Sequence, residues 1–163
     1  MGKKRELRLP STTDQIQVIE KFVEEISDEY HLHDSYFGNI LIALTEAFDN
    51  AVKHGNKGES SKNVHLLVQQ KPDGLLFSVI DQGQGFNYKE YDDMDALVEK
   101  GEATGRGLLL IHSLCDEVTF SNKGRVISML FRITGIDSDI YEKRYNLMHD
   151  YFKSHKKVDS NQR

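Results

Sequence analysis

The chain has 163 residues, of which 38% are hydrophobic and 29% charged, and its net charge at pH 7 is −5. This size predicts one compact domain with a sizeable core and excludes a second full domain. The negative net charge argues against general nucleic-acid binding, and no apolar run approaches the roughly 20 residues of a membrane-spanning helix.

The amino terminus and the cysteine content both favour a cytoplasmic protein that binds no membrane. Residues 1–6 are basic but lead into no apolar stretch of the signal-peptide type. The only cysteine, Cys115, lies in an apolar helical pattern. We therefore expect a buried, chemically quiet thiol in a reducing compartment.

A strand and an amphipathic helix are predicted at the start of the chain. Residues 6–9 form a short strand that ends at Pro10, and the polar residues 11–14 offer N-caps for a helix that reaches about Tyr30. The apolar residues of this helix recur every three or four positions and leave the acidic residues facing water.

A second helix begins near residues 33–35 and ends at Gly55, and its apolar residues again form one stripe. We interpret His31 and His33 as loop histidines. They lie two positions apart, which is too close for a shared helical face, and no cysteine pair accompanies them in a zinc-site spacing.

The later elements are predicted from alternating apolar patterns and turn residues. They are strands at 64–70 and 75–81, a polar lid with a short helical turn at 86–104, a helix at 107–116, strands at 117–121 and 126–133, and a terminal helix at 136–157. Turn residues join each pair of strands. This order predicts an α+β fold, a two-layer sandwich with helices on one face of a mixed, mainly antiparallel sheet.

One side of the second helix carries polar side chains suited to catalysis. Glu46, Asn50 and His54 are four residues apart, so they form one stripe that is offset from the apolar stripe. The amide oxygen of Asn50 suits Mg²⁺, and Glu46 one turn earlier is placed to accept a proton from an incoming nucleophile. Lys53 and His54 fit a contact with phosphate and a contact with the last helix carbonyls equally well.

The segment DQGQGF at residues 81–86 follows an apolar strand. The carboxylate of Asp81 lies at the edge of the core and needs a donor, which an adenine amino group supplies. Gly83 and Gly85 permit positive φ and a close approach of the backbone to a base or ribose, and Phe86 ends the segment.

A third segment places Gly105, Arg106, Gly107 and Leu108 at the start of an apolar helix. The first N–H groups of a helix attract phosphate, and Arg106 either adds positive charge there or is simply solvated. Neither a GxxxxGK[ST] loop nor a strand-anchored GxGxxG occurs, which excludes P-loop and Rossmann sites.

Each segment alone is also typical of ordinary structure, such as a solvated helix face or a turn after a strand. Their joint occurrence within residues 46–108 favours one ATP site. EAFDNAVKHGN, DQGQGF and GRGLLLI resemble the N, G1 and G2 boxes of the GHKL (Bergerat-fold) ATPase superfamily. The resemblance covers most of residues 6–134 and is greatest to single-domain anti-sigma factors of the serine-kinase type.

The resemblance implies a histidine-kinase-like ATPase domain at residues 1–135, followed at 136–163 by a helical extension and polar tail. By it, Glu46 is the general base, Asn50 the Mg²⁺ ligand and Asp81 the residue that reads the adenine amino group. The loop glycines are Gly83, Gly85, Gly105 and Gly107. Related proteins often have Thr where this chain has Arg125, which predicts a weaker final contact with the nucleotide.

The leading hypothesis is an ATP- and Mg²⁺-dependent protein serine/threonine kinase that regulates transcription by partner switching. Glu46 would deprotonate a serine on an antagonist protein. The resemblance implies an antagonist and/or a sigma factor as partners, and a homodimer. Two alternatives stay open: a non-catalytic module in which ATP sets the affinity for a protein partner, and a histidine-kinase-like catalytic domain that acts in trans.

Overall fold

The computed structural model describes residues 3–91, 103–133 and 138–161. Its sheet has five strands in the order β1-β2-β3-β5-β4, and every neighbouring pair is antiparallel. The strands are β1 (Lys4–Pro10), β2 (Asn63–Lys71), β3 (Gly74–Ile80), β4 (Glu117–Ser121) and β5 (Val126–Arg132). The predicted α+β sandwich is confirmed, and the described sheet is antiparallel rather than mixed.

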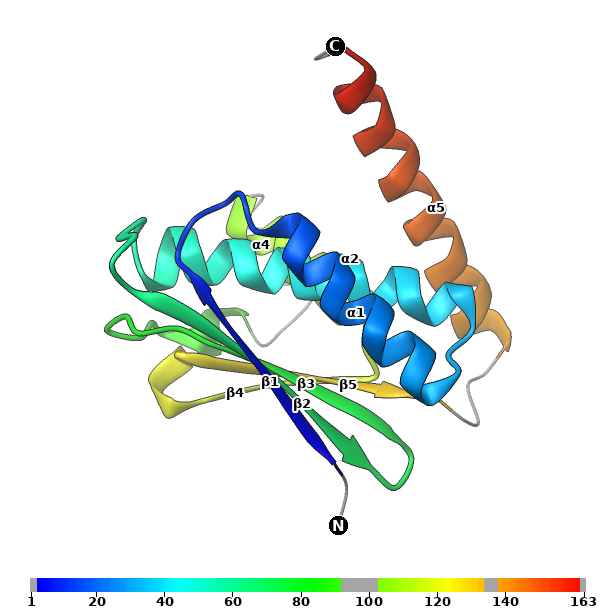
Figure 1. Cartoon of the computed structure of the whole chain (residues 1–163), viewed down its shortest axis with the longest axis horizontal. Helices are drawn as coiled ribbons and strands as arrows, with labels where there is room; N and C mark the ends of the chain where they lie inside the picture. Colours follow the sequence, from blue (N-terminus) through cyan, green and yellow to red (C-terminus); the bar gives the residue numbers. More distant parts are fainter. Residues whose placement is uncertain (1–2, 92–102, 134–137, 162–163) are drawn as a thin grey trace.

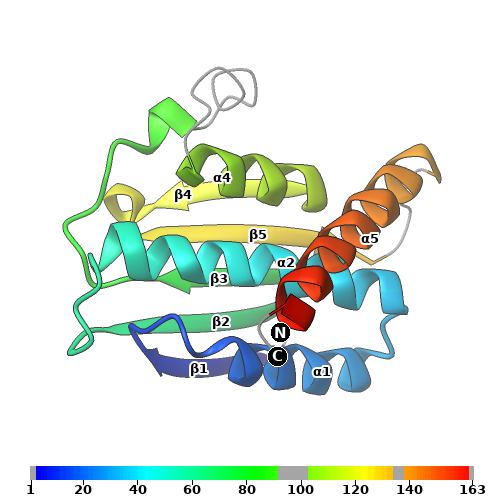
Figure 2. The ribbon, with the colours of Figure 1, turned by 90° about the horizontal axis from the view of Figure 1, so that it is seen from above.

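The helices pack on one face of this sheet (Figures 1 and 2). They are α1 (Ile16–Tyr30), α2 (Asp34–Asn50), α4 (Ala103–Leu114) and α5 (Ser138–Asn161), with the short turns η1 (Ala51–Gly55), η2 (Tyr88–Tyr91) and η3 (Asn122–Gly124). Alternate residues of β2, namely Val64, Leu66 and Val68, are buried in the core between sheet and helices. This alternation is the period of a strand with one covered face.

The start of α1 differs from the prediction. Its N-cap is Gln15, and no side chain bonds a helix N–H group there. The Thr12 hydroxyl donates to the Asp14 carboxylate, and the Gln15 amide donates to both side chains. The side chains expected to cap the helix therefore bind one another. His33, by contrast, caps α2, because its Nδ1 accepts from the Ser35 N–H at 3.2 Å.

The helical segment that contains α2 ends at Gly55 as predicted, but its last turn, η1, is π-helical: the Ala51 carbonyl accepts from the Asn56 N–H at 2.8 Å. One boundary near the candidate site differs from the prediction. Helix α4 begins at Ala103 rather than at Gly107. A glycine within a helix costs only about 1 kcal/mol relative to alanine. The packing of α4 against α2 outweighs this cost, so the helix continues through its glycines.

Helix α5 crosses the outer side of α2, and its far end projects away from the sandwich (Figures 1 and 2). A Cβ at Gly38 of α2 would overlap the Met148 side chain and lie 3.3 Å from Phe152 of α5. Arg144 of α5 is 6% exposed and pairs with Asp116 at 3.0 Å. Helix α2 is thus covered by the sheet on one side and by α5 on the other.

The terminal helix, the predicted lid and Cys115 remain to be compared with the structure. The described part of the terminal helix is Ser138–Asn161, which extends past the predicted end at 157, and the predicted start at 136 lies outside the described residues. Most of the predicted lid, residues 92–102, lies outside the described residues. Cys115 is buried as expected, and burial raises the pKa of its thiol well above the ordinary value. Within the described ranges, no helix combines the length and apolar character needed to cross a membrane.

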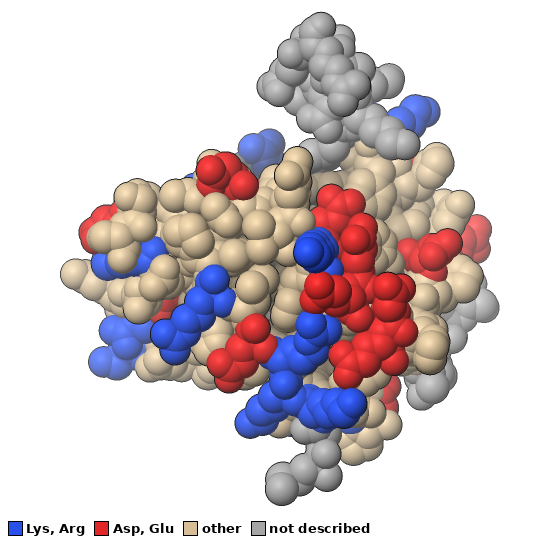
Figure 3. Space-filling model, in the orientation of Figure 1, with Lys and Arg blue, Asp and Glu red and all other residues tan. Residues whose placement is uncertain are grey.

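The exposed side of α1 is strongly acidic, and basic side chains of β1 lie beside it (Figure 3). Arg5 of β1 donates to Glu25 at 2.8 Å and to Glu29 at 3.4 Å. These exposed pairs tie the edge strand to α1, although each contributes little to stability.

Candidate functional site

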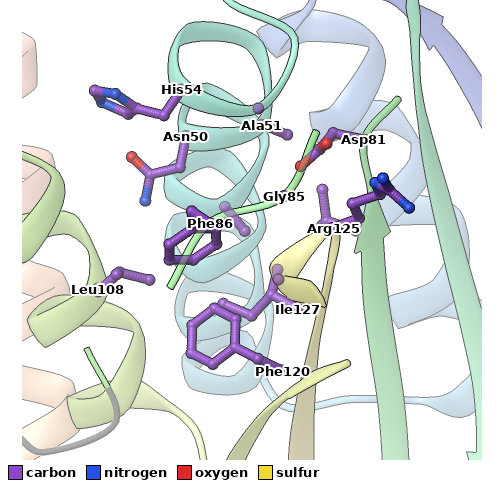
Figure 4. Close-up of a pocket in the computed structure, with 14 residues that line it drawn as sticks. Asn50, Ala51, His54, Asp81, Gly85, Phe86, Leu108, Phe120, Arg125 and Ile127 are labelled. Atoms are coloured by element: carbon purple, nitrogen blue, oxygen red, sulfur yellow. The ribbon is translucent and has the colours of Figure 1, made fainter. Parts of the chain in front are cut away.

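A pocket opens at the end of α2 between the helices and the sheet (Figure 4). It holds about 740 Å³ of empty space, part of it open to solvent, which is the size of a small-molecule site. Its lining residues are Ala47, Asn50, Ala51, His54, Gly55, Val79, Asp81, Gly85, Phe86, Leu108, Phe120, Gly124, Arg125 and Ile127. Residues of all three predicted segments therefore meet at one cavity.

Asn50 reaches the pocket from the last turn of α2 (Figure 4). Its Nδ2 atom is buried and has no hydrogen-bond partner within the described structure. A buried amide left unpaired is unfavourable, so this side chain is available to a polar ligand.

Gly107 brings the first turns of α4 against the catalytic candidates of α2. A Cβ at this position would lie 3.0 Å from Oε2 of Glu46 and 3.5 Å from Nδ2 of Asn50. Glycine thus lets α4 approach Glu46 and Asn50 more closely than most side chains permit. Glu46 itself is partly buried at this contact.

The turn after β3 fixes the orientation of Asp81. Its Oδ1 accepts from the Gly83 N–H at 2.8 Å, and the Asp81 side chain packs directly on Gly55, where a Cβ would overlap the carboxylate. Burial raises the pKa of Asp81, while the Gly83 hydrogen bond and the charges of Arg125 and Lys62 oppose this shift. The carboxylate is thus held at the pocket in one orientation.

The other end of this turn interlocks with η3. Gly85 has φ of 86°, and the Phe86 N–H donates to the Lys123 carbonyl at 2.9 Å. A Cβ at Gly124 would lie 2.7 Å from Cδ1 of Phe86. The Phe86 ring meets Phe120 edge to face with 5.6 Å between centroids, which forms an aromatic wall of the pocket.

Asn56 is a buried residue that the sequence did not single out for function. Its Oδ1 accepts from the Gln82 N–H at 2.8 Å, and its Nδ2 donates to the Asn63 carbonyl at 3.0 Å and to the Ser11 hydroxyl at 3.2 Å. Asn56 therefore joins the end of η1 to the turn that carries Asp81. Only its place within EAFDNAVKHGN hinted at this role.

Other candidates lie farther from the cavity. Lys53 is exposed and is not among the lining residues, and its charge acts on Asp49, where it opposes the burial that raises the pKa. Arg106 is exposed and Gly105 is buried, both in the first turn of α4. Their contacts with phosphate stay a prediction.

The fold and these contacts agree with the comparisons to known proteins. A family model described as a histidine kinase-like ATPase domain matches residues 9–131. The chain belongs to the histidine kinase-like ATPase family. Two relatives are both named serine-protein kinase RsbW. That of Staphylococcus epidermidis is 31% identical over 134 residues, 77% of this chain and 84% of the relative. That of Staphylococcus aureus strain MRSA252 is 27% identical over 132 residues, 76% and 83% of the two chains.

The resemblance to the anti-sigma factor kinases of the GHKL superfamily is thereby confirmed. The histidine kinase-like ATPase match ends at residue 131, before α5 begins at Ser138. A division of the chain at residue 135 stays a prediction, because α5 packs closely on α2 within this member of the family.

Proposed function

We propose that this protein is an ATP- and Mg²⁺-dependent protein serine/threonine kinase that acts as an anti-sigma factor and phosphorylates a serine of an antagonist protein. The names of the RsbW relatives support the activity. The observation that carries the proposal is the meeting of Gly107 with Glu46 and Asn50 beside the pocket. This contact supports the proposal because a candidate base and a candidate metal ligand lie together against Gly107, in the second turn of α4.

ATP binds in the pocket with its adenine against Asp81 and its phosphates toward the start of α4. The acidic side chain accepts from the adenine amino group. Glycine at positions 55 and 83 lets the Asp81 turn pack directly on the end of η1, which holds the carboxylate in place for this contact. The first N–H groups of α4 lie at the helix end that favours negative charge.

Asn50 would hold Mg²⁺ through its side-chain oxygen, because Mg²⁺ takes oxygen ligands. Its unpaired Nδ2 is a donor and is available to an acceptor such as a phosphate oxygen. Within the described residues, no three His, Cys, Asp or Glu side chains gather into a metal site. Mg²⁺ commonly keeps several waters and takes only one or two protein ligands together with phosphate oxygens. When bound, it neutralises charge on those oxygens.

Glu46 accepts the proton of the attacking serine hydroxyl. Tyr151 of α5 is near enough to interact electrostatically with Glu46 and Asp49. Burial, with a further contribution from these two carboxylates, raises the pKa of Tyr151 to about 12. Tyr151 therefore stays neutral at physiological pH, so Glu46 is the better base of the two.

The partners that we propose are an antagonist protein, a sigma factor, and a second copy of this chain. A switch of this kind acts in the cytoplasm, where ATP and the transcription machinery are present. The net charge of −5 fits action through proteins rather than direct binding to nucleic acid.

The kinase proposal is tested by incubating the protein with labelled ATP and the antagonist that co-purifies with it from its own cell. We expect E46Q to reduce phosphoryl transfer at least about a hundredfold, because general base catalysis contributes that much. ATP affinity, measured by calorimetry, should stay within about twofold, since Glu46 is not among the residues that line the pocket. Glu20→Gln, on the exposed side of α1, is the matched control.

Each outcome separates the candidate functions. Unchanged transfer by E46Q removes Glu46 from the mechanism. ATP-dependent complex formation with no phosphoprotein indicates a binding module instead of a kinase. Acid-labile phosphate on a partner histidine indicates a histidine kinase acting in trans.

A further inference from the structure

Arg125 lies between η3 and the first residue of β5, and its side chain lines the pocket near Asp81 (Figure 4). It belongs to none of the three sequence segments. At this position the sequence predicted a weaker nucleotide contact, because related proteins often have Thr. The contacts of Arg125 indicate a different role.

Arg125 holds the Asp81 turn at two points. Its backbone carbonyl accepts from the Asp81 N–H at 3.0 Å, and its Nε donates to the Gly83 carbonyl at 2.7 Å. The residues on either side of Gln82 are therefore tied to the start of β5. A planar guanidinium makes such a bond in a fixed direction, which a lysine ammonium does not.

The same turn determines how the Asp81 carboxylate faces the pocket. Oδ1 is bound to the Gly83 N–H at 2.8 Å, and the side chain packs on Gly55. Any movement of Gly83 therefore moves the carboxylate with it. The bond from Arg125 to Gly83 thus acts on Asp81 through one intervening residue.

The positive charge of Arg125 also favours the contact of Asp81 with an amino group. Burial favours the protonated form of Asp81 and raises its pKa, and the positive charge of Arg125 opposes that shift more strongly than Lys62 does. An ionised carboxylate is an acceptor only, whereas a protonated one also donates. Arg125 thus favours the form of Asp81 that pairs with an amino group.

We propose that Arg125 is a positioning residue for base selection: it holds Asp81 so that the carboxylate accepts from the 6-amino group of adenine and disfavours 6-oxo purines. The inference rests on the proposed ATP site. The oxygen of a 6-oxo purine is an acceptor, so it would face the acceptor oxygens of the Asp81 carboxylate without a hydrogen bond. A site built around one hydrogen bond discriminates strongly against a ligand that lacks the donor.

The test is calorimetric binding of Mg·ATP and Mg·ITP, whose bases differ at the 6-position, to the wild-type protein, R125A, R125M and R125K. We expect R125A and R125M to bind ATP about tenfold more weakly, in line with the loss of one charged hydrogen bond, and ITP within about twofold of wild type. R125K should recover part of the loss, because it keeps the charge. Arg132→Ala, at the other end of β5 and paired with Asp73 and Glu117, is the matched control.

The two ligands separate positioning from a general structural effect. A selective loss of ATP affinity supports the inference. ATP affinity of R125M within twofold of wild type overturns it, as does an equal loss for ATP and ITP, which would mean only a loosened pocket. A wild-type protein that binds neither nucleotide contradicts the proposed ATP site itself, independently of any Arg125 variant.

Discussion

Asp81 is an acid whose ionised form is unfavourable in the folded protein. Burial raises its pKa above the ordinary value of 3.8, despite the Gly83 hydrogen bond and two nearby cations. The unfolded chain ionises this group more easily than the folded one does. Ionisation of Asp81 therefore lowers the free energy of unfolding as pH rises from the unfolded to the folded pKa.

We expect D81N to melt at a higher temperature than the wild type at pH 7.5, without nucleotide. The amide keeps an oxygen for the Gly83 N–H and removes the buried charge. The difference in melting temperature between D81N and the wild type should become smaller toward pH 4, where the Asp81 carboxylate of the wild type takes up its proton. Thermal unfolding at both pH values measures this, and a D81N protein that is less stable at pH 7.5 would contradict it. The same variant should lose ATP binding.

At the scale of elements, a buried ion pair helps to anchor α5, beside its packing on Gly38 of α2. The side chains of Arg144 and Asp116 are 7% and 10% exposed, and the pair joins α5 to the start of β4. Asp116 also accepts from the Arg132 N–H at 2.7 Å, whereas Nε of Arg144 has no partner in the described structure. Such a pair stabilises little in itself, but removal of one partner leaves a buried charge.

We expect R144M to lower the free energy of unfolding by about 3 kcal/mol, because Asp116 is then buried without its cation. The double variant R144M/D116N should recover most of that loss, since the asparagine keeps an acceptor for Arg132. Arg132→Met, which breaks two exposed ion pairs, is the control and should have a much smaller effect. Urea unfolding measures all three. Equal losses for R144M and R132M would show that α5 is not anchored here.

For the whole molecule, ligand binding and stability are linked. A nucleotide that binds only the folded state at one hundred times its Kd adds about 2.7 kcal/mol to the free energy of unfolding. For a chain of 163 residues, this corresponds to a rise in Tm of about 5–10 °C. We expect this rise with Mg·ATP and a smaller one with ATP and a chelator.

Asn50→Ala is the informative variant in this measurement. Without ligand its stability should stay within about 1 kcal/mol of wild type, because the removed Nδ2 has no partner to lose. With Mg·ATP the rise in Tm should fall by more than half. A full rise in the variant would exclude Asn50 as the Mg²⁺ ligand.

Much of the fold follows from local patterns in the sequence. The three-residue and four-residue recurrence of apolar side chains predicted α1 to Tyr30, where the helix does end. Alternation and turn residues predicted both hairpins, and β2 and β3 differ from the prediction by no more than one residue at each end. These signals are local, since periodicity and turn chemistry depend on neighbours in the chain.

The sequence by itself determined the family, the order of elements and the three segments that reach the pocket, because each is encoded within a few neighbouring residues. Only the tertiary structure decided that Arg125 holds the Asp81 turn, that Asn56 joins η1 to it, and that α5 packs on Gly38. The hydrogen bonds to that turn span 26 and 42 positions along the chain. Contacts of that range depend on how strands and helices pack, and no pattern of adjacent residues specifies them.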